Sequence, residues 1–119
     1  MIFTVMMSTS TVSVTNATVN GWLSGGSFTN SGSSTVNQGN VDLTINNTTF
    51  AKETAGGSFV GGSGSTTNVG DVSITVNGAT FTGNLYGGVY HYNNSAASTS
   101  TVGDVTVTLA GGTIAGMFF

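Results

Sequence analysis

Few side chains of this 119-residue chain ionise, and their types and spacing limit its chemistry. There are four acids, one lysine and one histidine, with no cysteine and no arginine. Asp71 and Asp104 each follow a glycine, so a fold that stacked these two positions would place two carboxylates together. Carboxylate oxygens suit Ca²⁺, which makes Asp71 and Asp104 the calcium candidates. The simpler interpretation is a pair of solvated turn positions.

His91 lies between Tyr90 and Tyr92 and has no cysteine or arginine to act with. A Ser/His/Asp arrangement is compatible with the composition, but nothing in the sequence sets its geometry. A loop histidine without a catalytic role is the simpler interpretation. We therefore predict no catalytic residue, no cofactor and no enzymatic activity.

The charge balance argues against several classes of partner. With Lys52 as the single basic residue and a net charge of −3, we expect no binding to nucleic acid or to an anionic membrane. No run approaches the roughly 18 apolar residues of a spanning helix, so we expect no membrane insertion. Residues 1–7 are apolar without a basic flank, and we expect no signal peptide there. The Gly-, Ser-, Thr- and Asn-rich composition is typical of secreted repeats and predicts an extracellular or cell-surface location.

An internal repeat determines the architecture. Glycine pairs at 25–26, 56–57 and 87–88 follow one another at intervals of 31 residues, and apolar residues keep the same offsets from them. A fourth copy follows after a two-residue insertion. We predict a single repeat domain over residues 1–119. Its parts are an N-terminal strand or arm at 1–8 and repeats at about 9–39, 40–70, 71–103 and 104–119.

Each repeat is expected to contain three short strands. Apolar and polar residues alternate in segments such as 72–76, which predicts a strand with one apolar face. A second strand such as 79–82 and a third such as 84–90 follow. Corners are expected where Asn or Gly tolerates positive φ, at Asn16, Asn47, Gly78 and Gly111. The tracts without periodicity are expected to be loops: 30–37, 61–68 and 93–100.

Two folds compete for this pattern. Asn77-Gly78 between alternating segments is a hairpin signal that would build an antiparallel sandwich. The constant spacing of apolar positions instead stacks each residue above its counterpart in a parallel coil. We predict an all-β fold, a parallel β-solenoid (β-helix) of about three and a half coils of 31–33 residues with three short strands per coil.

Stacked counterparts in such a solenoid form columns about 4.8 Å apart. Five columns are expected to point inward: Val12/Leu43/Ile74/Val107, Val14/Ile45/Val76/Leu109, Val19/Phe50/Phe81/Ile114, Leu23/Leu85/Phe118 and Phe28/Phe59/Tyr90. Three are expected to point outward and to hydrogen-bond along the stack: Ser13/Thr44/Thr75/Thr108, Thr18/Thr49/Thr80/Thr113 and Thr15/Asn46/Asn77/Ala110. The glycine pairs are expected to allow a bend or a close backbone approach.

Residues 70–88, with the sequence GDVSITVNGATFTGNLYGG, show the repeat most clearly. This pattern resembles the parallel β-solenoid repeats of bacterial surface proteins, the class that contains autotransporter passenger domains and adhesin-like arrays. The resemblance extends from about Thr9 to Phe119. It implies a coil architecture and a surface location, and it implies no particular ligand or reaction.

The two ends of the sequence are apolar, and no polar cap is recognisable at either end. Either the chain is a piece of a longer array, or identical subunits stack head to tail into a filament. The second interpretation predicts an assembly interface at Ile2, Phe3, Val5, Met117, Phe118 and Phe119. The partner would then be an identical subunit, with residues 1–7 supplying a strand that the fourth coil lacks.

The function predicted from these patterns is structural, a self-assembling extracellular or cell-surface solenoid. The alternative is an adhesin-like or carbohydrate-binding module of a larger surface protein. Its contacts with a glycan or another surface ligand would be the aromatics expected to be exposed, namely Trp22, Tyr86, Tyr90 and Tyr92. The outward threonine columns suggest ice binding as a lesser alternative, although Asp42 interrupts them.

Overall fold

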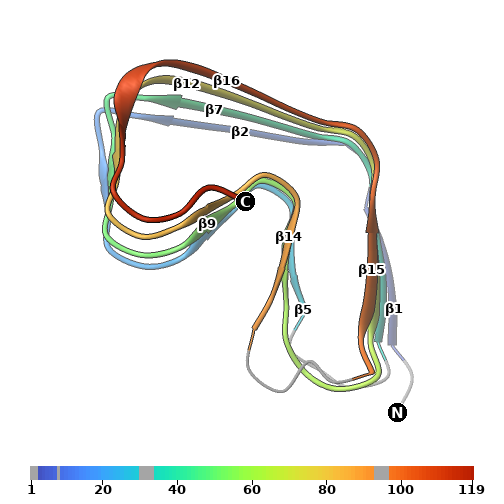
Figure 1. Cartoon of the computed structure of the whole chain (residues 1–119). Helices are drawn as coiled ribbons and strands as arrows, with labels where there is room; N and C mark the ends of the chain where they lie inside the picture. The colour runs from blue at the N-terminus through green and yellow to red at the C-terminus, as the bar shows by residue number, and fades with distance from the viewer. Residues whose placement is uncertain (1–2, 8, 30–33, 93–96) are drawn as a thin grey trace.

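The computed structural model of the chain describes residues 3–7, 9–29, 34–92 and 97–119. Every helix or strand assigned within these residues is a β-strand, and no described segment is a helix that could cross a membrane. The chain winds in coils that lie on top of one another, so Figure 1, which looks along the stack, shows them nearly superimposed. The predicted all-β, parallel β-solenoid is confirmed. The hairpin sandwich is wrong, because all strand pairs among the described residues are parallel.

Four sheets run along the stack. The first sheet contains β2 (Ser10–Thr15), β7 (Val41–Asn46), β12 (Val72–Phe81) and β16 (Val105–Ile114), with β3 (Thr18–Val19) and β8 (Thr49–Phe50). The second contains β4 (Leu23–Ser24), β9 (Thr54–Ala55) and β13 (Leu85–Tyr86). The third contains β5 (Ser27–Thr29), β10 (Ser58–Val60) and β14 (Val89–His91). The fourth contains β1 (Phe3–Met7), β6 (Ser34–Gln38), β11 (Thr66–Val69) and β15 (Thr99–Val102).

We number the coils by these strands. Coil one is β2 to β6, coil two β7 to β11, coil three β12 to β15, and coil four β16 with the bridge from Phe118 to Leu85. Strand β1 precedes coil one and pairs with β6. The strand segments predicted for coils one to three are present, although the first two are one continuous strand in β12. The glycine pair divides the third segment in two, as in β9 and β10.

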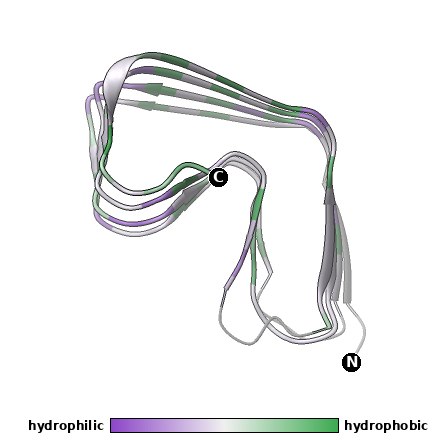
Figure 2. Ribbon diagram, viewed as in Figure 1, coloured by the Kyte–Doolittle hydropathy of each residue, from purple (hydrophilic) through white to green (hydrophobic). Residues whose placement is uncertain are grey.

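The apolar core lies between the first and second sheets. Alternate residues of β7 point inward, and Leu43 and Ile45 are completely buried there. Phe50, Phe81 and Leu85 close the same space, so four of the five inward columns are confirmed in coils two and three. Figure 2 shows the alternation as hydrophobic segments that recur at the same place in successive coils.

The corners occur where Asn and Gly predict them. Backbone φ is 51° at Asn16 and 47° at Asn47, and it is 77° at Gly78 and 76° at Gly111. This left-handed conformation costs glycine nothing and asparagine little. The predicted corners are therefore confirmed.

The glycine pairs confirm the expected close approach of the backbone. A side-chain carbon added at Gly25 would collide with the carbonyl oxygen of Gly56, and one added at Gly56 would collide with that of Gly87. Carbonyl oxygens of the next coil therefore occupy the space that any larger residue needs. Only glycine fits this column.

The prediction that the variable tracts are loops was wrong for part of each tract. Strands β6, β11 and β15 form there and build the fourth sheet. Their inward residues include Ser34, Gln38 and Thr67, which are polar and yet buried. Because hydroxyl and amide groups share this part of the interior with Val36 and Val69, the strands lack the continuous apolar alternation that identified the others.

The column Phe28/Phe59/Tyr90 was also assigned to the wrong face. In the third sheet the residues that precede and follow these aromatic residues in the sequence face the interior instead. Thr29 Oγ1 lies 3.2 Å from Thr67 Oγ1 of the fourth sheet, and His91 Nε2 lies 2.7 Å from Ser100 Oγ. The rings therefore point to the opposite side, where the ribbon bends inward between β9 and β14 (Figure 1).

Candidate functional site

The fourth coil presents apolar side chains to solvent at one end of the stack. Val105 and Leu109 are 40% and 47% exposed, whereas their counterparts in coil three, Val72 and Val76, are buried. The sequence pattern is the same in both coils. The exposure arises because among the described residues no further strand lies on top of β16.

Two hollows open at this end of the molecule. One, of about 300 Å³, lies over the core and is lined by residues such as Phe81, Leu109 and Ile114. The other, of about 480 Å³, is lined by Val102, Val105 and Phe118 among others. Inward side chains of a further coil would fill such spaces, as those of coil three do beneath coil four.

Both ends of the stack also leave strand edges unpaired. Among the described residues β16 pairs only with β12 and β15 only with β11. At the other end β2 pairs only with β7 and β1 only with β6. Open strand edges of this kind are templates for pairing with another chain.

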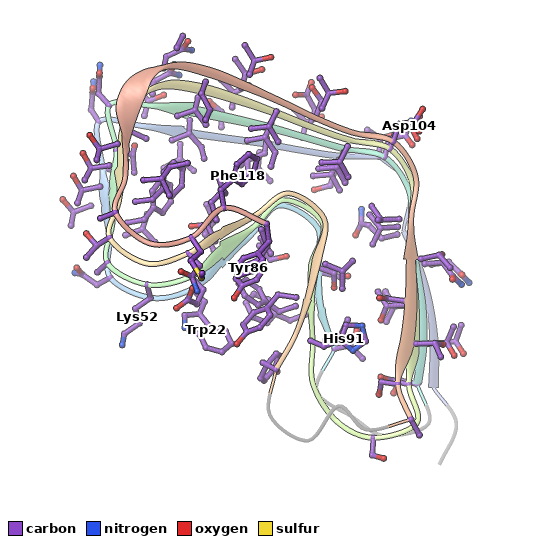
Figure 3. The ribbon with its side chains drawn as sticks, viewed as in Figure 1. Trp22, Lys52, Tyr86, His91, Asp104 and Phe118 are labelled. Carbon is purple, nitrogen blue, oxygen red and sulfur yellow. The ribbon has the colours of Figure 1, made fainter. Side chains whose placement is uncertain are left out.

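The residues predicted to form the assembly interface are divided between these two ends. Met117, Phe118 and Phe119 are 63%, 51% and 61% exposed in coil four. Figure 3 shows Phe118 in the space enclosed by the first and second sheets. Phe3 and Val5 belong to β1 at the opposite end, in register with Ser34 and Val36, and Ile2 lies outside the described residues. One molecule therefore keeps the two groups apart, and only a second molecule could join them.

Backbone N–H groups at two corners donate to side chains of the coil below. Asn40 Oδ1 accepts the N–H of Asp71 at 2.9 Å, and Asp71 Oδ1 accepts the N–H of Asp104 at 2.9 Å. At the second corner Glu53 Oε2 accepts the N–H of Asn84 and Asn84 Oδ1 that of Met117. These hydrogen bonds fix the height of each coil relative to the next.

Of the three outward columns, only the amide column hydrogen-bonds along the stack. Asn77 Nδ2 donates to Asn46 Oδ1 at 2.8 Å, and Asn46 Nδ2 donates to Thr15 Oγ1 at 3.2 Å. The prediction was wrong for the two hydroxyl columns, all of whose members are described and none of which bonds to another. The longer amide side chain reaches across the strand spacing of about 4.8 Å in this column.

The four aromatics proposed as ligand contacts are brought together. Trp22 stacks on the buried Phe59, with ring centroids 4.9 Å apart, and meets Tyr92 edge-on at 5.1 Å. Tyr86 stacks on Tyr90 at 4.2 Å. Figure 3 places Trp22 and Tyr86 on the same side of the third sheet, away from His91. Trp22 is 39% exposed, so this aromatic cluster packs on itself and still offers an indole to solvent.

Polar groups border the aromatic cluster. Asn84 Nδ2 donates to the Tyr86 hydroxyl at 3.3 Å. Burial raises the pKa of the Tyr90 phenol above its usual value, and the neighbouring Tyr86 and Glu53 raise it further. Removal of the phenol proton would place a negative charge in apolar surroundings beside a carboxylate, which is unfavourable.

The calcium candidates lie on adjacent coils at one exposed corner, as their spacing predicted. There Asp71 already accepts the N–H of Asp104, which explains its residue type without a metal ion. Within the described part of the chain no three His, Cys, Asp or Glu residues lie close enough together to hold a metal. Asp104 points outward at this corner in Figure 3.

His91 is not isolated, as its hydrogen bond to Ser100 shows. It occupies the column of Thr29 and Val60, which are buried in the lower coils. The third and fourth sheets therefore use this histidine as an interior residue of coil three. The sequence did not reveal the pairing, because Ser100 lies in a tract expected to be a loop.

Comparison of the chain with known protein families, with curated proteins and with solved structures found no match in any of the three.

Proposed function

We propose that this protein is a structural β-solenoid module that stacks end to end on identical copies to form a filament. The proposal assigns no catalytic step. The observation that carries it is the match between the two ends, because coil four exposes the residues that are core in coil three, above unpaired strand edges.

The residues at the coil-one end are apolar and could pack on the exposed apolar residues of coil four. Val12, Val14 and Val19 belong to the inward columns of Val107, Leu109 and Ile114. A second copy placed one strand spacing above coil four would extend each column by an apolar residue. Its β1 would extend the fourth sheet beyond β15, since β1 already occupies the layer next to β6.

Low charge supports the same proposal. A stack repeats every column, and like charges directly opposite one another on neighbouring strands are unfavourable. The chain has only five charged residues in all. The composition is also typical of secreted repeats, so the proposed location is extracellular or at the cell surface.

Electron microscopy and light scattering of the purified 119-residue chain at several concentrations test the proposal. We expect unbranched fibres with an axial spacing of about 4.8 Å in fibre diffraction.

Leu109→Lys should prevent elongation, because it puts a charge on the coil-four core surface. Thr108→Lys, on the outward face of the same strand, is the matched control and should elongate normally. A wild-type chain that stays monomeric at every concentration would refute the proposal.

The aromatic cluster supports a second candidate function, the binding of a glycan or another surface ligand. The observation in its favour is the exposed indole of Trp22, in the same aromatic cluster as Tyr86, whose hydroxyl accepts a hydrogen bond from Asn84. Binding to a panel of polysaccharides tests it. Trp22→Ala should abolish binding, and Ser73→Ala, on the outward face of the first sheet, should retain it. The absence of binding by the wild type would exclude this function.

A further inference from the structure

The corner hydrogen bonds all have the same direction along the stack. The side-chain oxygen belongs to the lower coil and the N–H to the upper coil, both for Asn40 and Asp71 and for Asp71 and Asp104. The corner of Glu53, Asn84 and Met117 follows the same order. At the first corner the coil-four end therefore presents a carboxylate acceptor, and the coil-one end presents an N–H group.

Asp104 is the uppermost residue of the first of these columns. Its N–H donates to Asp71, but its carboxylate accepts no hydrogen bond from any described residue. The residue at the same column position below Asn40 is Thr9, which precedes β2 as Asn40 precedes β7. Thr9 is uncharged and exposed, and its backbone N–H is the group that would lie above Asp104 in a continued stack.

We propose that Asp104 is the positioning residue that sets the register and the direction of stacking between two copies of this chain. Its carboxylate accepts the backbone N–H of Thr9 of the second copy, as Asp71 accepts that of Asp104. This inference rests on the proposed function and adds to it a defined polarity: coil four of one copy meets coil one of the next.

The opposite arrangements lack this complementarity. Two coil-four ends placed together would bring Asp104 against Asp104, two like charges with no N–H between them. At this corner two coil-one ends would bring the N–H groups of two Thr9 residues together without a carboxylate to accept them. Here only the head-to-tail contact pairs the Asp104 carboxylate with an N–H, and it repeats without closing on itself.

Substitutions at Asp104 test the positioning role. Asp104→Ala removes the acceptor and should raise the critical concentration for elongation about tenfold, the effect expected for one hydrogen bond to a charged group. Asp104→Asn is the matched control, because Asn40 already performs this role with an amide oxygen. It also removes the charge, so its critical concentration should stay within about twofold of the wild type. The carboxylate has no partner within the described chain, so both monomers should show wild-type circular dichroism and unfolding midpoints.

Disulfide trapping tests the direction. Thr11 and Thr106 belong to one outward column, at opposite ends of the stack. In the proposed contact Thr106 lies one strand spacing, about 4.8 Å, below Thr11 of the second copy, within the range that a disulfide spans. A mixture of Thr11→Cys and Thr106→Cys chains, oxidised during assembly, should give the mixed disulfide as the main product. The natural chain has no cysteine to interfere.

The outcomes separate this inference from the proposed function. A wild-type chain that never elongates overturns both. A wild type that elongates while Asp104→Ala and Asp104→Asn share one critical concentration overturns the role of Asp104 alone. A main product of Thr106→Cys paired with itself, or the absence of any disulfide in assembled fibres, overturns the head-to-tail direction.

Discussion

Phe50 and Phe81 lie face to face in consecutive coils, with ring centroids 4.8 Å apart and ring planes inclined by only 4°. The two residues are in register between β8 and β12, and both are buried. Their ring spacing equals the strand spacing of a sheet, so the side chains repeat at the same interval as the backbone.

Removing one of these rings should be costly. We expect Phe81→Ala to lower the free energy of unfolding by about 3–5 kcal/mol, because it leaves a cavity in the narrow core between the first and second sheets. Thr80→Ala, on the exposed side of the same strand, should change it by less than about 0.5 kcal/mol. Urea denaturation of the two variants makes the comparison, and similar losses would contradict the assigned faces.

Thr54 offers a stabilising substitution. Its hydroxyl is buried without a hydrogen-bond partner, in the column of Leu23 and Leu85. Thr54→Val keeps the shape and removes the unpaired polar group, so we expect a gain of about 1 kcal/mol in unfolding free energy.

Thr48 is the control for this substitution. It is equally buried, but its hydroxyl donates to the carbonyl oxygen of Asn46 at 2.9 Å. Thr48→Val should therefore destabilise by about 1 kcal/mol, the opposite sign. Thermal and urea unfolding of both variants would show the two signs, and a loss in Thr54→Val would contradict the assignment.

The glycine column should not tolerate alanine. Gly56→Ala would force a methyl group against the carbonyl oxygen of Gly87, a backbone atom that cannot move without separating two coils. We expect a loss of about 3 kcal/mol. Gly21→Ala, where nothing lies within 4 Å of the added carbon, should be close to neutral in the same denaturation experiment.

Stability should decline in alkaline solution. Because the pKa of Tyr90 is raised in the folded state, the unfolded chain loses this proton first. The contribution of Tyr90 is complete below the unfolded pKa of about 10 and is lost as the pH rises through the folded pKa. Denaturation midpoints between neutral and strongly alkaline pH should fall less steeply for Tyr90→Phe. Equal slopes in the two proteins would show that Tyr90 does not contribute.

The sequence alone was sufficient for the coil. Positions such as Ile45 and Val76 recur at a constant interval, and a constant interval between apolar residues requires each to lie above its counterpart. The corners at Asn47 and Gly78 follow from local chemistry, since few other residues tolerate positive φ. The apolar surface at the coil-four end could also be predicted from the sequence, because the apolar pattern of the third repeat continues into residues 104–119.

Only the tertiary structure decided which side of a strand is interior. Alternation defines two faces of β10, but Phe59 became buried on the outer face because Trp22 and its aromatic neighbours cover it. The fourth sheet was hidden for a related reason. Its inward residues mix polar side chains such as Thr67 and Gln38 with valines such as Val36. The hydrogen bond of Thr67 to Thr29 joins residues far apart in the chain, and such long-range pairs leave no periodic signal in the sequence.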